Sequence, residues 1–496
     1  MKLKEIIKTL KYKRLYNLSN PEIAGITYDS RKVKENLIFV ALKGASLDGH
    51  HFINDAISRG AKVLIVNKKS AVLPSDVGEI LVEDTRNALY SISAEFYGNP
   101  SKKLKVVGIT GTNGKTTTSF IIKHIIESTG DKCGLIGTIS YQIGERSISS
   151  TNTTPESLDI QKLFSDMVEE GCKWAVMEVS SHGIAQGRIT NLHFDTGIFT
   201  NIASHEHLDY HKNFKNYLQA KLKFFSHYLN ESEKEGKKGI VNIDDPYAGH
   251  FIKALKKNGI DYLTYGKKNS DVHLVDYKMS KDGNLLVVEI KGEKTEFHTK
   301  LHGLGNIYNT LTGITFAVSE GIPLKNLKQS LAALSFVSGR YETVDEGQNF
   351  DVIVDYAHTH YALSNLLRSV KELRPKRIIL VFGCGGDRDK SKRPLMGNIA
   401  VKIADIVFIT SDNPRSEDPQ DIITDIERGI PFYFRGKYIA IADRKQAIKE
   451  AISFAREGDY VVIAGKGHET FQILKNTVVP FDDREEARKA IREAGK

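Results

Sequence analysis

Apolar runs and helical stripes alternate along most of the chain. The runs at Lys105–Thr110 and Trp174–Val179 are short enough for strands, and each is followed by a segment with helical spacing. The same alternation returns nearer the end of the chain, with runs at Val352–Asp355, Arg377–Phe382, Ile406–Thr410 and Tyr460–Ala464. Because strands joined by helices form mostly parallel sheets covered by those helices, the pattern predicts an α/β fold.

Two breaks in this pattern predict three domains. The turn-forming cluster Tyr97-Gly-Asn-Pro-Ser101 ends a smaller pattern with strands at Leu37–Leu42 and Lys62–Val66, and a second break falls near Ser338-Gly339. We therefore expect a small N-terminal α/β domain over residues 1–100, a central domain with a mostly parallel sheet over 101–338, and a Rossmann-like C-terminal domain over 339–496. Residues 271–299 alternate around a turn at 282–284, which predicts a β-hairpin insertion.

Composition agrees with a multidomain globular protein. The 496 residues exceed what one core supports, and 40% hydrophobic and 26% charged residues are ordinary values. Neither a membrane-spanning apolar run nor a signal peptide is evident, so we expect a cytoplasmic protein. Cys133, Cys172 and Cys384 lack metal or redox spacing and fit a reducing compartment without disulfides.

The net charge of +9 is spread along the chain rather than gathered on one element. Nucleic-acid binding would favour clustered Lys and Arg with aromatic residues between them. We therefore expect anionic small-molecule substrates and no nucleic-acid partner. The sequence gives no direct sign of oligomerisation, and a monomer is the simplest expectation.

A candidate phosphate loop lies between the strand ending at Thr110 and the helical segment that follows. Glycines allow backbone N–H groups to converge on phosphate oxygens, and the start of the next helix adds its positive dipole end. Lys115 is expected to reach the outer phosphates and Thr116 to hold Mg²⁺. The spacing is unusual, because isoleucine occupies position 109 and the earlier glycine is Gly108. The predicted loop comprises Gly111, Thr112, Asn113, Gly114, Lys115, Thr116 and Thr117.

Two further residues are candidates for the metal side of this site. Glu178 ends the apolar strand that begins at Trp174, a position from which a carboxylate can serve Mg²⁺. His207 lies in HEHLDYH, where surface histidines are the plainer interpretation.

Eight motifs in order resemble the Mur ligase family: GTNGKTTT, MEVSSH, FTNI with HLDYH, GRYE, VDYAH, FGCGGDRDKSKRP, DNPR and AGKGHE. The resemblance covers residues from about 25 to 484. It implies an N-terminal domain for a UDP-sugar, a central ATPase and a C-terminal domain that brings an amino acid. It further implies an ATP- and Mg²⁺-dependent ligase of peptidoglycan synthesis, most similar to members that add the third residue of the muramoyl peptide.

The resemblance also implies where the UDP-muramoyl dipeptide binds. Its uridine nucleotide is expected at Ser30, Ala45, Ser46 and Leu47. Its peptide is expected at Asn152, Thr153, Thr154, Ser180, Gln186 and Arg188. A second interpretation of Asn152–Thr154 is a plain turn followed by a helix with Pro155 in its first position.

For ATP, the resemblance implies contacts from Asn306, Asn309, Arg340 and Asp355, with His358 as a further candidate. Lys221 matches the lysine that the family carries as a carbamate, an anion able to help hold Mg²⁺. The expected metal-side groups are Thr116, Glu178, His207 and carbamylated Lys221, and the expected catalytic residues are Lys115, Glu178, His207 and Lys221.

The DNPR motif resembles the family signature for diaminopimelate, which differs from lysine by a second carboxylate. A guanidinium fork suits that carboxylate, and Glu469 can face an ammonium group. The expected amino-acid site comprises Arg388, Asp412, Asn413, Pro414, Arg415, Gly465 and Glu469. The motif also fits a turn without a binding role, since Asn-Pro favours turns.

Three segments depart from the family pattern: His205-Glu206 within HEHLD, His360-Tyr361 after His358-Thr359, and Leu304-Gly305 before Asn306. They leave open a paralogous ligase for a related peptide. The sequence also leaves open addition of lysine, folylpolyglutamate synthesis, a nucleic-acid-stimulated ATPase and a non-catalytic precursor-binding protein. Arg415 argues against lysine addition, and the YDSR and DNPR segments argue against folylpolyglutamate synthesis. Intact Lys115, Thr116 and Glu178 argue against a non-catalytic protein.

Overall fold

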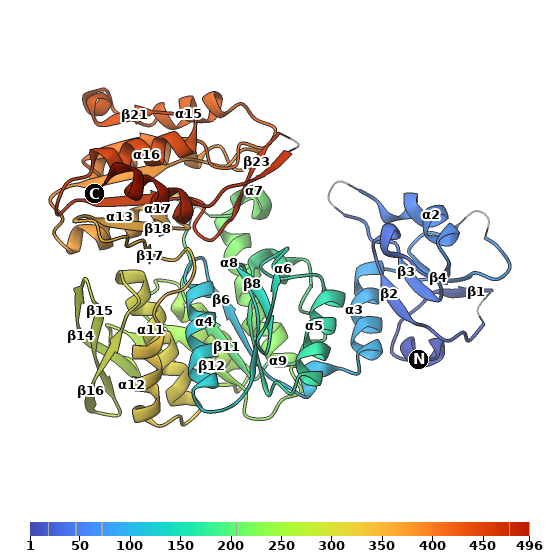
Figure 1. Cartoon of the computed structure of the whole chain (residues 1–496). Helices are drawn as coiled ribbons and strands as arrows, with labels where there is room; N and C mark the ends of the chain where they lie inside the picture. The colour runs from blue at the N-terminus through green and yellow to red at the C-terminus, as the bar shows by residue number, and fades with distance from the viewer. Residues whose placement is uncertain (18, 45–46, 71–72, 205, 476, 496) are drawn as a thin grey trace.

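The computed structural model describes residues 1–17, 19–44, 47–70, 73–204, 206–475 and 477–495. Three main sheets follow one another along the chain, each covered by helices, as Figure 1 shows. The central sheet lies between the other two units, with the C-terminal unit above it and the N-terminal unit to one side. The mixed α/β class predicted from the apolar runs is confirmed.

The N-terminal sheet has strand order β1-β5-β4-β3-β2, with only β1 antiparallel to its neighbour. Its strands are β1 Arg14–Tyr16, β2 Gly25–Thr27, β3 Leu37–Val40, β4 Ala61–Val66 and β5 Gly78–Leu81. Its helices are α1 Leu3–Ile6, α2 Ile53–Ser58 and α3 Thr85–Phe96, with 3-10 turns η1 Ser30–Lys32 and η2 Gly49–Phe52. Helix α3 begins at the cap Asp84 and packs against α5 of the central unit, so it joins the two (Figure 1).

The central sheet has the order β16-β15-β14-β13-β12-β11-β6-β10-β7-β8-β9. Its first strands are β6 Lys105–Thr110, β7 Cys133–Ile136, β8 Ser140–Ile143, β9 Arg146–Ser149, β10 Trp174–Glu178 and β11 Thr196–Phe199. The remaining strands are β12 Lys238–Asn242, β13 Asp261–Gly266, β14 Val272–Ser280, β15 Gly283–Ile290 and β16 Glu293–Thr299. From β7 to β14 neighbouring strands are parallel, and both edges are antiparallel hairpins.

The helices of this unit are α4 Lys115–Glu127, α5 Ser157–Glu169, α6 Ser181–Ala185, α7 Leu208–His211, α8 Phe214–Lys223, α9 Leu229–Glu231, α10 Ala248–Lys257, α11 Leu304–Ser319 and α12 Leu324–Ala333. A 3-10 turn, η3 Pro100–Lys102, precedes β6, and a π-helical turn, η4 Phe224–Tyr228, continues α8. The predicted hairpin over 271–299 is a three-stranded meander, because β16 adds a second turn.

Strand β6 shows why this unit carries the site. Val106 packs in the core on one face of the sheet, while Val107 and Ile109 pack in the core on the other. At Gly108 an added Cβ would lie 2.5 Å from the ring of Phe224, so the glycine lets the π-helical turn lie directly against the strand. That contact brings the end of α8 beneath the loop that follows β6.

The C-terminal sheet has the order β17-β18-β22-β19-β20-β21, parallel except for β17. Its strands are β17 Glu342–Thr343, β18 Asp351–Asp355, β19 Ile378–Phe382, β20 Ile406–Ile409, β21 Tyr438–Ala440 and β22 Tyr460–Ala464, with a separate hairpin of β23 Phe471–Leu474 and β24 Thr477–Pro480. Helices α13 His360–Glu372, α14 Lys392–Ile403, α15 Pro419–Glu427, α16 Arg444–Phe454 and α17 Asp483–Ala494 and the 3-10 turn η5 Phe432–Lys437 complete it. The four strands predicted here are confirmed.

All three cysteines are buried and free, as expected from their spacing. Burial raises the pKa of each thiol, to about 12 for Cys384. Among the described residues, every helix is too short or too polar to cross a bilayer.

Candidate active site

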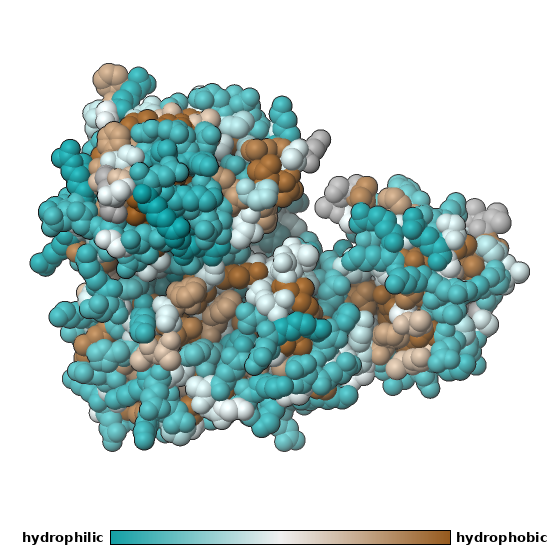
Figure 2. All heavy atoms as spheres, in the orientation of Figure 1, coloured by the Kyte–Doolittle hydropathy of each residue, from teal (hydrophilic) through white to brown (hydrophobic). Residues whose placement is uncertain are grey.

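A cavity of about 520 Å³ lies between the central and C-terminal units, at the carboxyl ends of β6 and β10. Figure 2 shows that hydrophilic side chains cover most of this face of the molecule. Sequence-predicted residues from separate motifs share the cavity wall: Gly111–Thr117, Asn152–Thr154, Glu178, Ser180, Gln186, Arg188, His207, Lys221, Asn306, Asn309, Arg340, Asp355 and His358.

The loop 111–114 is held in shape by its neighbours. Asn201 accepts hydrogen bonds from the backbone N–H groups of Thr112 and Asn113, at 2.8 and 3.0 Å. Gly114 has a φ of +86°, and an added Cβ would lie 2.4 Å from Asn309 Oδ1. The turn therefore needs glycine there for its conformation and for space. Helix α4 starts at the next residue, so its free N–H groups point toward the cavity.

Two lysines meet at one carbonyl oxygen of this loop. Lys115 Nζ donates to Gly111 O and Thr112 O, both at 3.0 Å, and Lys221 Nζ donates to Gly111 O at 2.7 Å. Burial lowers the pKa of both side chains, and for Lys221 the charge of Lys115 lowers it further. The two side-chain nitrogens therefore meet at the backbone of the loop where phosphate oxygens would bind.

Glu178 is fully buried at the end of β10. Its two carboxylate oxygens accept hydrogen bonds from the backbone N–H and the hydroxyl of Thr138, at 2.8 and 2.9 Å. The Thr138 hydroxyl also lies 3.0 Å from that of Thr153, a predicted dipeptide residue. Sequence reasoning missed Thr138, which follows β7 and forms no motif of its own.

The C-terminal unit reaches the phosphate loop through Arg340. Its guanidinium donates to the Thr116 hydroxyl at 3.1 Å and lies 4.6 Å from the ring centroid of Tyr356. Asp355 accepts hydrogen bonds from the backbone N–H groups of Tyr341 and Ala357, and burial raises the pKa of its carboxyl group. Both side chains line the cavity.

His207 and Glu206 form another part of the wall. His207 adopts a φ of 56°, and its ring centroid lies 5.1 Å from that of His182. The residue is exposed at the cavity wall, where the protein atoms around its ring displace water and lower its pKa. Glu206 is buried, and its Oε1 has no hydrogen-bond partner among the described residues. His205, the other half of this departure from the family pattern, lies outside the described residues.

Ion pairs connect the residues expected to bind the dipeptide with the N-terminal unit. Arg188 donates to Thr154 O at 2.7 Å and lies 3.2 Å from Glu156, which also binds Arg86 of α3 at 2.9 Å. The Tyr90 hydroxyl, also on α3, donates to Gln186 O. Helix α5 begins at Ser157, so the interpretation that placed Pro155 in its first position is wrong.

The residues expected to bind the amino acid form a separate group in the C-terminal unit. The side-chain amide of Asn413 donates to the Glu469 carboxylate at 2.8 Å and accepts from Lys466 Nζ at 3.2 Å. Lys466 Nζ also donates to the Glu469 carboxylate, at 3.0 Å. Gly465 has a φ of +121°, and an added Cβ would lie 2.5 Å from Asp412 Oδ2. This group does not line the cavity described above, but the charge of Arg388 helps to lower the pKa of His182.

The expected uridine residues lie further away, in the N-terminal unit. Ser30 is buried in η1 and Leu47 is exposed, and neither lines the cavity. Ala45 and Ser46 lie outside the described residues. A hollow separates this unit from the C-terminal one in Figure 2.

Comparison with known proteins gives the family. Three family models match along the chain: "Mur ligase family, catalytic domain" over residues 22–97, "Mur ligase middle domain" over 109–317, and "Mur ligase, glutamate ligase domain" over 339–467. The chain belongs to the Mur ligase family. Among the relatives of this Mur ligase are proteins named UDP-N-acetylmuramoyl-L-alanyl-D-glutamate–2,6-diaminopimelate ligase. The Clostridium tetani protein is 44% identical over 99% of this chain and 100% of its own length, and that of Geobacillus kaustophilus 43% over 100% of both.

Solved structures agree with the fold of this Mur ligase. A structure with the same ligase name matches with a TM-score of 0.69 and 30% identity, over 100% of this chain and 99% of that one. A MurF ligase from Thermotoga maritima in complex with ADP matches with a TM-score of 0.65 over 95% of this chain and 96% of that one. Its 20% identity makes it informative for the fold alone.

Proposed function

We propose that this Mur ligase uses ATP to join diaminopimelate to the glutamate of UDP-N-acetylmuramoyl-L-alanyl-D-glutamate. One observation carries the proposal: the phosphate loop, the dipeptide-side residues and Lys221 share one cavity, beside a C-terminal unit that holds the DNPR arginine. The full-length relatives with this activity in their names support the same substrate set.

The proposed reaction has two steps. A carboxylate oxygen of the dipeptide attacks the γ-phosphorus of ATP, and the bond to the β,γ-bridging oxygen breaks to release ADP and leave an acyl phosphate. The amine of diaminopimelate then attacks the acyl carbon, loses a proton and expels inorganic phosphate, which leaves the amide.

Lys115 would neutralise the transferring phosphoryl group. Positioning and electrostatic stabilisation supply most of the catalysis in such transfers, and they are stronger where water is excluded. Lys115 is held in place by two backbone oxygens of the loop, so its ammonium needs little rearrangement to meet the nucleotide. Thr153 and Arg188, on the same cavity wall, would hold the acceptor peptide.

The described residues contain no group of three or more His, Cys, Asp or Glu side chains arranged for a metal ion. Mg²⁺ commonly binds through one or two carboxylates together with substrate phosphates and water, so a sparse set is no obstacle. Thr116, Glu178 and His207 would hold the ion, and the unpaired Glu206 Oε1 in the same cavity fits a cationic neighbour. Mg²⁺ would supply charge neutralisation between ATP and the acceptor.

Carbamylation of Lys221 would complete this set. In carbamylation the neutral amine of lysine adds to CO₂, forming an N–C bond and releasing a proton, and burial lowers the pKa of Lys221 well below its usual value. An uncharged or anionic group at this position would also remove the repulsion between Lys115 and Lys221. The carbamate is therefore the better partner for Mg²⁺ beside Glu178.

Selection of the amino acid would depend on Arg415. Burial lowers its pKa, and the nearby charge of Arg388 lowers it further. The carboxylate at the far end of diaminopimelate would compensate these two cations, whereas lysine has no such group. Arg415 is partly buried, and if a bound amino acid covers its guanidinium without a carboxylate partner the cost is about 2–5 kcal/mol, which corresponds to roughly 30- to several-thousand-fold in selectivity. The monomeric state and cytoplasmic location expected from the sequence stay predictions.

The test is release of phosphate from ATP in the presence of UDP-muramoyl-Ala-Glu, with diaminopimelate, lysine, ornithine and glutamate compared as second substrates. We expect diaminopimelate to give the highest kcat/KM. A preference for lysine would contradict the assignment of Arg415, and inactivity with all four would favour a paralogue with another peptide substrate.

A second experiment tests for the acyl phosphate. In ATP labelled at the β,γ-bridging oxygen, we expect positional isotope exchange that requires the UDP-dipeptide and proceeds without the amino acid. Absence of exchange under reversible conditions would count against the intermediate.

A further inference from the structure

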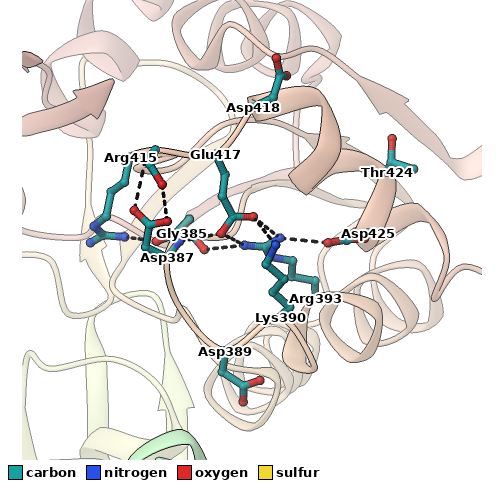
Figure 3. A network of polar contacts seen from close by, with 12 residues as sticks. Gly385, Asp387, Asp389, Lys390, Arg393, Arg415, Glu417, Asp418, Thr424 and Asp425 are labelled. Atoms are coloured by element: carbon teal, nitrogen blue, oxygen red, sulfur yellow. Dashed lines mark hydrogen bonds and ion pairs between the residues drawn. The ribbon is translucent and has the colours of Figure 1, made fainter. Parts of the chain in front are cut away.

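Arg393, in the first turn of α14, is a fully buried arginine outside the cavity. Its guanidinium donates to both carboxylate oxygens of Glu417 at 2.9 Å, to Asp425 at 2.9 Å and to the carbonyl of Gly385 at 3.3 Å, as Figure 3 shows. A guanidinium that engages a carboxylate through two parallel hydrogen bonds fixes its orientation as well as its position. Arg393 therefore clamps Glu417 against the helix.

Glu417 transmits this anchor to the loop after β19. Its carboxylate also accepts the backbone N–H of Asp387 at 2.7 Å and lies 3.0 Å from Lys390 Nζ. The bonds from Arg393 lower the pKa of Glu417 to about 2, so the carboxylate is ionised at neutral pH. One charged pair thus fixes two loops, 385–391 and 411–418.

Further bonds close the two loops onto each other. Asp387 has a φ of 54°, and its carboxylate accepts the hydroxyl of Ser416 at 2.6 Å and the backbone N–H of Ser416 at 3.2 Å. The backbone N–H of Gly386 donates to Asn413 O at 2.9 Å. At Gly386 an added Cβ would lie 1.9 Å from Pro414 O, so the loops approach as closely as backbone allows.

Arg415 lies inside this frame. Its guanidinium donates to Gly386 O at 2.8 Å, and an added Cβ at Gly385 would lie 3.0 Å from Arg415 Nη1. Its backbone has a φ of 53°, a conformation that non-glycine residues adopt only where surrounding contacts hold them. The loop 385–387 that Glu417 anchors therefore also directs the side chain of Arg415.

We propose that Arg393 and Glu417 are positioning residues that set the specificity for the incoming amino acid by holding Arg415. The inference rests on the proposed function, because it assigns a role to the arginine that would read the second carboxylate. Neither residue lines the nucleotide cavity. Loss of the pair should therefore weaken diaminopimelate use without changing the use of ATP.

The test compares Glu417→Gln with the wild type. The amide keeps the shape of the side chain and loses its charge, and Arg393→Lys provides a second variant that keeps the charge and loses the fork. Kinetics with diaminopimelate, with lysine, and with ATP as the varied substrate give separate constants. Arg428→Gln is the matched control, because Arg428 binds the same Asp425 at 2.6 Å from an exposed position.

A misplacement of about 1 Å can cost roughly 100-fold, so we expect KM for diaminopimelate to rise about 10- to 100-fold in Glu417→Gln. KM for ATP and for the UDP-dipeptide should change less than about two-fold, and the preference for diaminopimelate over lysine should fall with the rise in KM. The KM of Arg393→Lys for diaminopimelate should lie between those of Glu417→Gln and the wild type. The KM of Arg428→Gln should match that of the wild type.

Equal rises in all three KM values would show a general structural role and overturn the proposal, as would an unchanged diaminopimelate KM in a folded Glu417→Gln protein. Thermal unfolding of each variant verifies folding. A wild-type enzyme inactive with diaminopimelate would instead refute the proposed function itself, so the two failures are distinct.

Discussion

At the residue scale, the side chains of Lys115 and Lys221 meet at the carbonyl oxygen of Gly111, so two basic groups of the site lie together. The side-chain nitrogens of both lysines bond the same oxygen; Lys221 is buried and Lys115 is partly buried. Their roles differ, because Lys115 opens α4 beside the phosphate loop and Lys221 comes from α8 beneath it. Substitutions at the two positions should therefore have different consequences.

Lys115→Ala removes the cation expected at the transferring phosphoryl group. Loss of one such preorganised group costs about 100- to 1,000-fold in kcat, and we expect a fall of that size in phosphate release. Lys162→Ala, on the exposed surface of α5, is the control and should retain wild-type activity. A Lys115→Ala enzyme that turns over at the normal speed would refute the proposed mechanism.

Lys221 should make stability depend on pH. Its pKa in the folded protein lies below the ordinary value of 10.5, so the unfolded chain binds more protons over the interval between these values. The contribution of Lys221 to the free energy of unfolding must then rise with pH across that interval, by at most about 1.4 kcal/mol per pH unit.

We expect this rise in CO₂-free buffer when urea unfolding of the wild type at pH 7 and pH 9 is compared with Lys221→Met. The free energy of unfolding of the wild type minus that of Lys221→Met should increase as pH increases. An unchanged difference would mean that Lys221 keeps an ordinary pKa in the folded protein.

At the scale of elements, the turn after β7 orients the carboxylate at the end of β10. Thr138→Val removes the hydroxyl bond to Glu178 and leaves the backbone bond. Groups that orient a metal ligand commonly change metal affinity by about 10- to 100-fold, so we expect the Mg²⁺ concentration for half-maximal activity to rise about 10-fold or more. Thr151→Val, whose hydroxyl contacts Tyr141 instead, should leave the Mg²⁺ dependence unchanged.

Sequence patterns predicted the elements best where local order decides the structure. The strand, the glycine loop and the helix around Gly114 are contiguous in sequence. The alternation of apolar and polar residues over 271–290 predicts a hairpin. The third strand of that meander, β16, was not predicted because its alternation is weak and polar. Thr138 and the pair of Arg393 and Glu417 were missed for another reason: each acts through a residue distant in sequence, and each is an ordinary polar residue for its segment.

At the scale of the whole molecule, the residues expected to bind the nucleotide and those expected to bind the amino acid form two separate groups. The nucleotide cavity lies between the central and C-terminal units, whereas the DNPR group lies outside its walls. Sequence reasoning could name both sets of residues but not their separation, since that depends on how the units are placed. We therefore expect the C-terminal unit to move toward the acceptor before the two sets are joined.

Small-angle scattering should detect that movement. We expect the radius of gyration to fall when a non-hydrolysable ATP analogue and the UDP-dipeptide are added together. Lys115→Ala, which weakens the hold on the nucleotide, should show a smaller change at the same ligand concentrations. A wild-type radius unchanged at saturation would place the amino-acid site within reach without any closure.

The bond from Arg340 to Thr116 ties the C-terminal unit to the loop that would bind nucleotide. Because Arg340 belongs to the C-terminal unit and Thr116 to the central one, the placement of the C-terminal unit and the affinity for ATP are linked, and each alters the other by the same free energy. A small molecule that binds elsewhere and holds the C-terminal unit away from Thr116 would then weaken ATP binding without touching the ATP pocket. Inhibitors of this enzyme need not resemble any of its substrates.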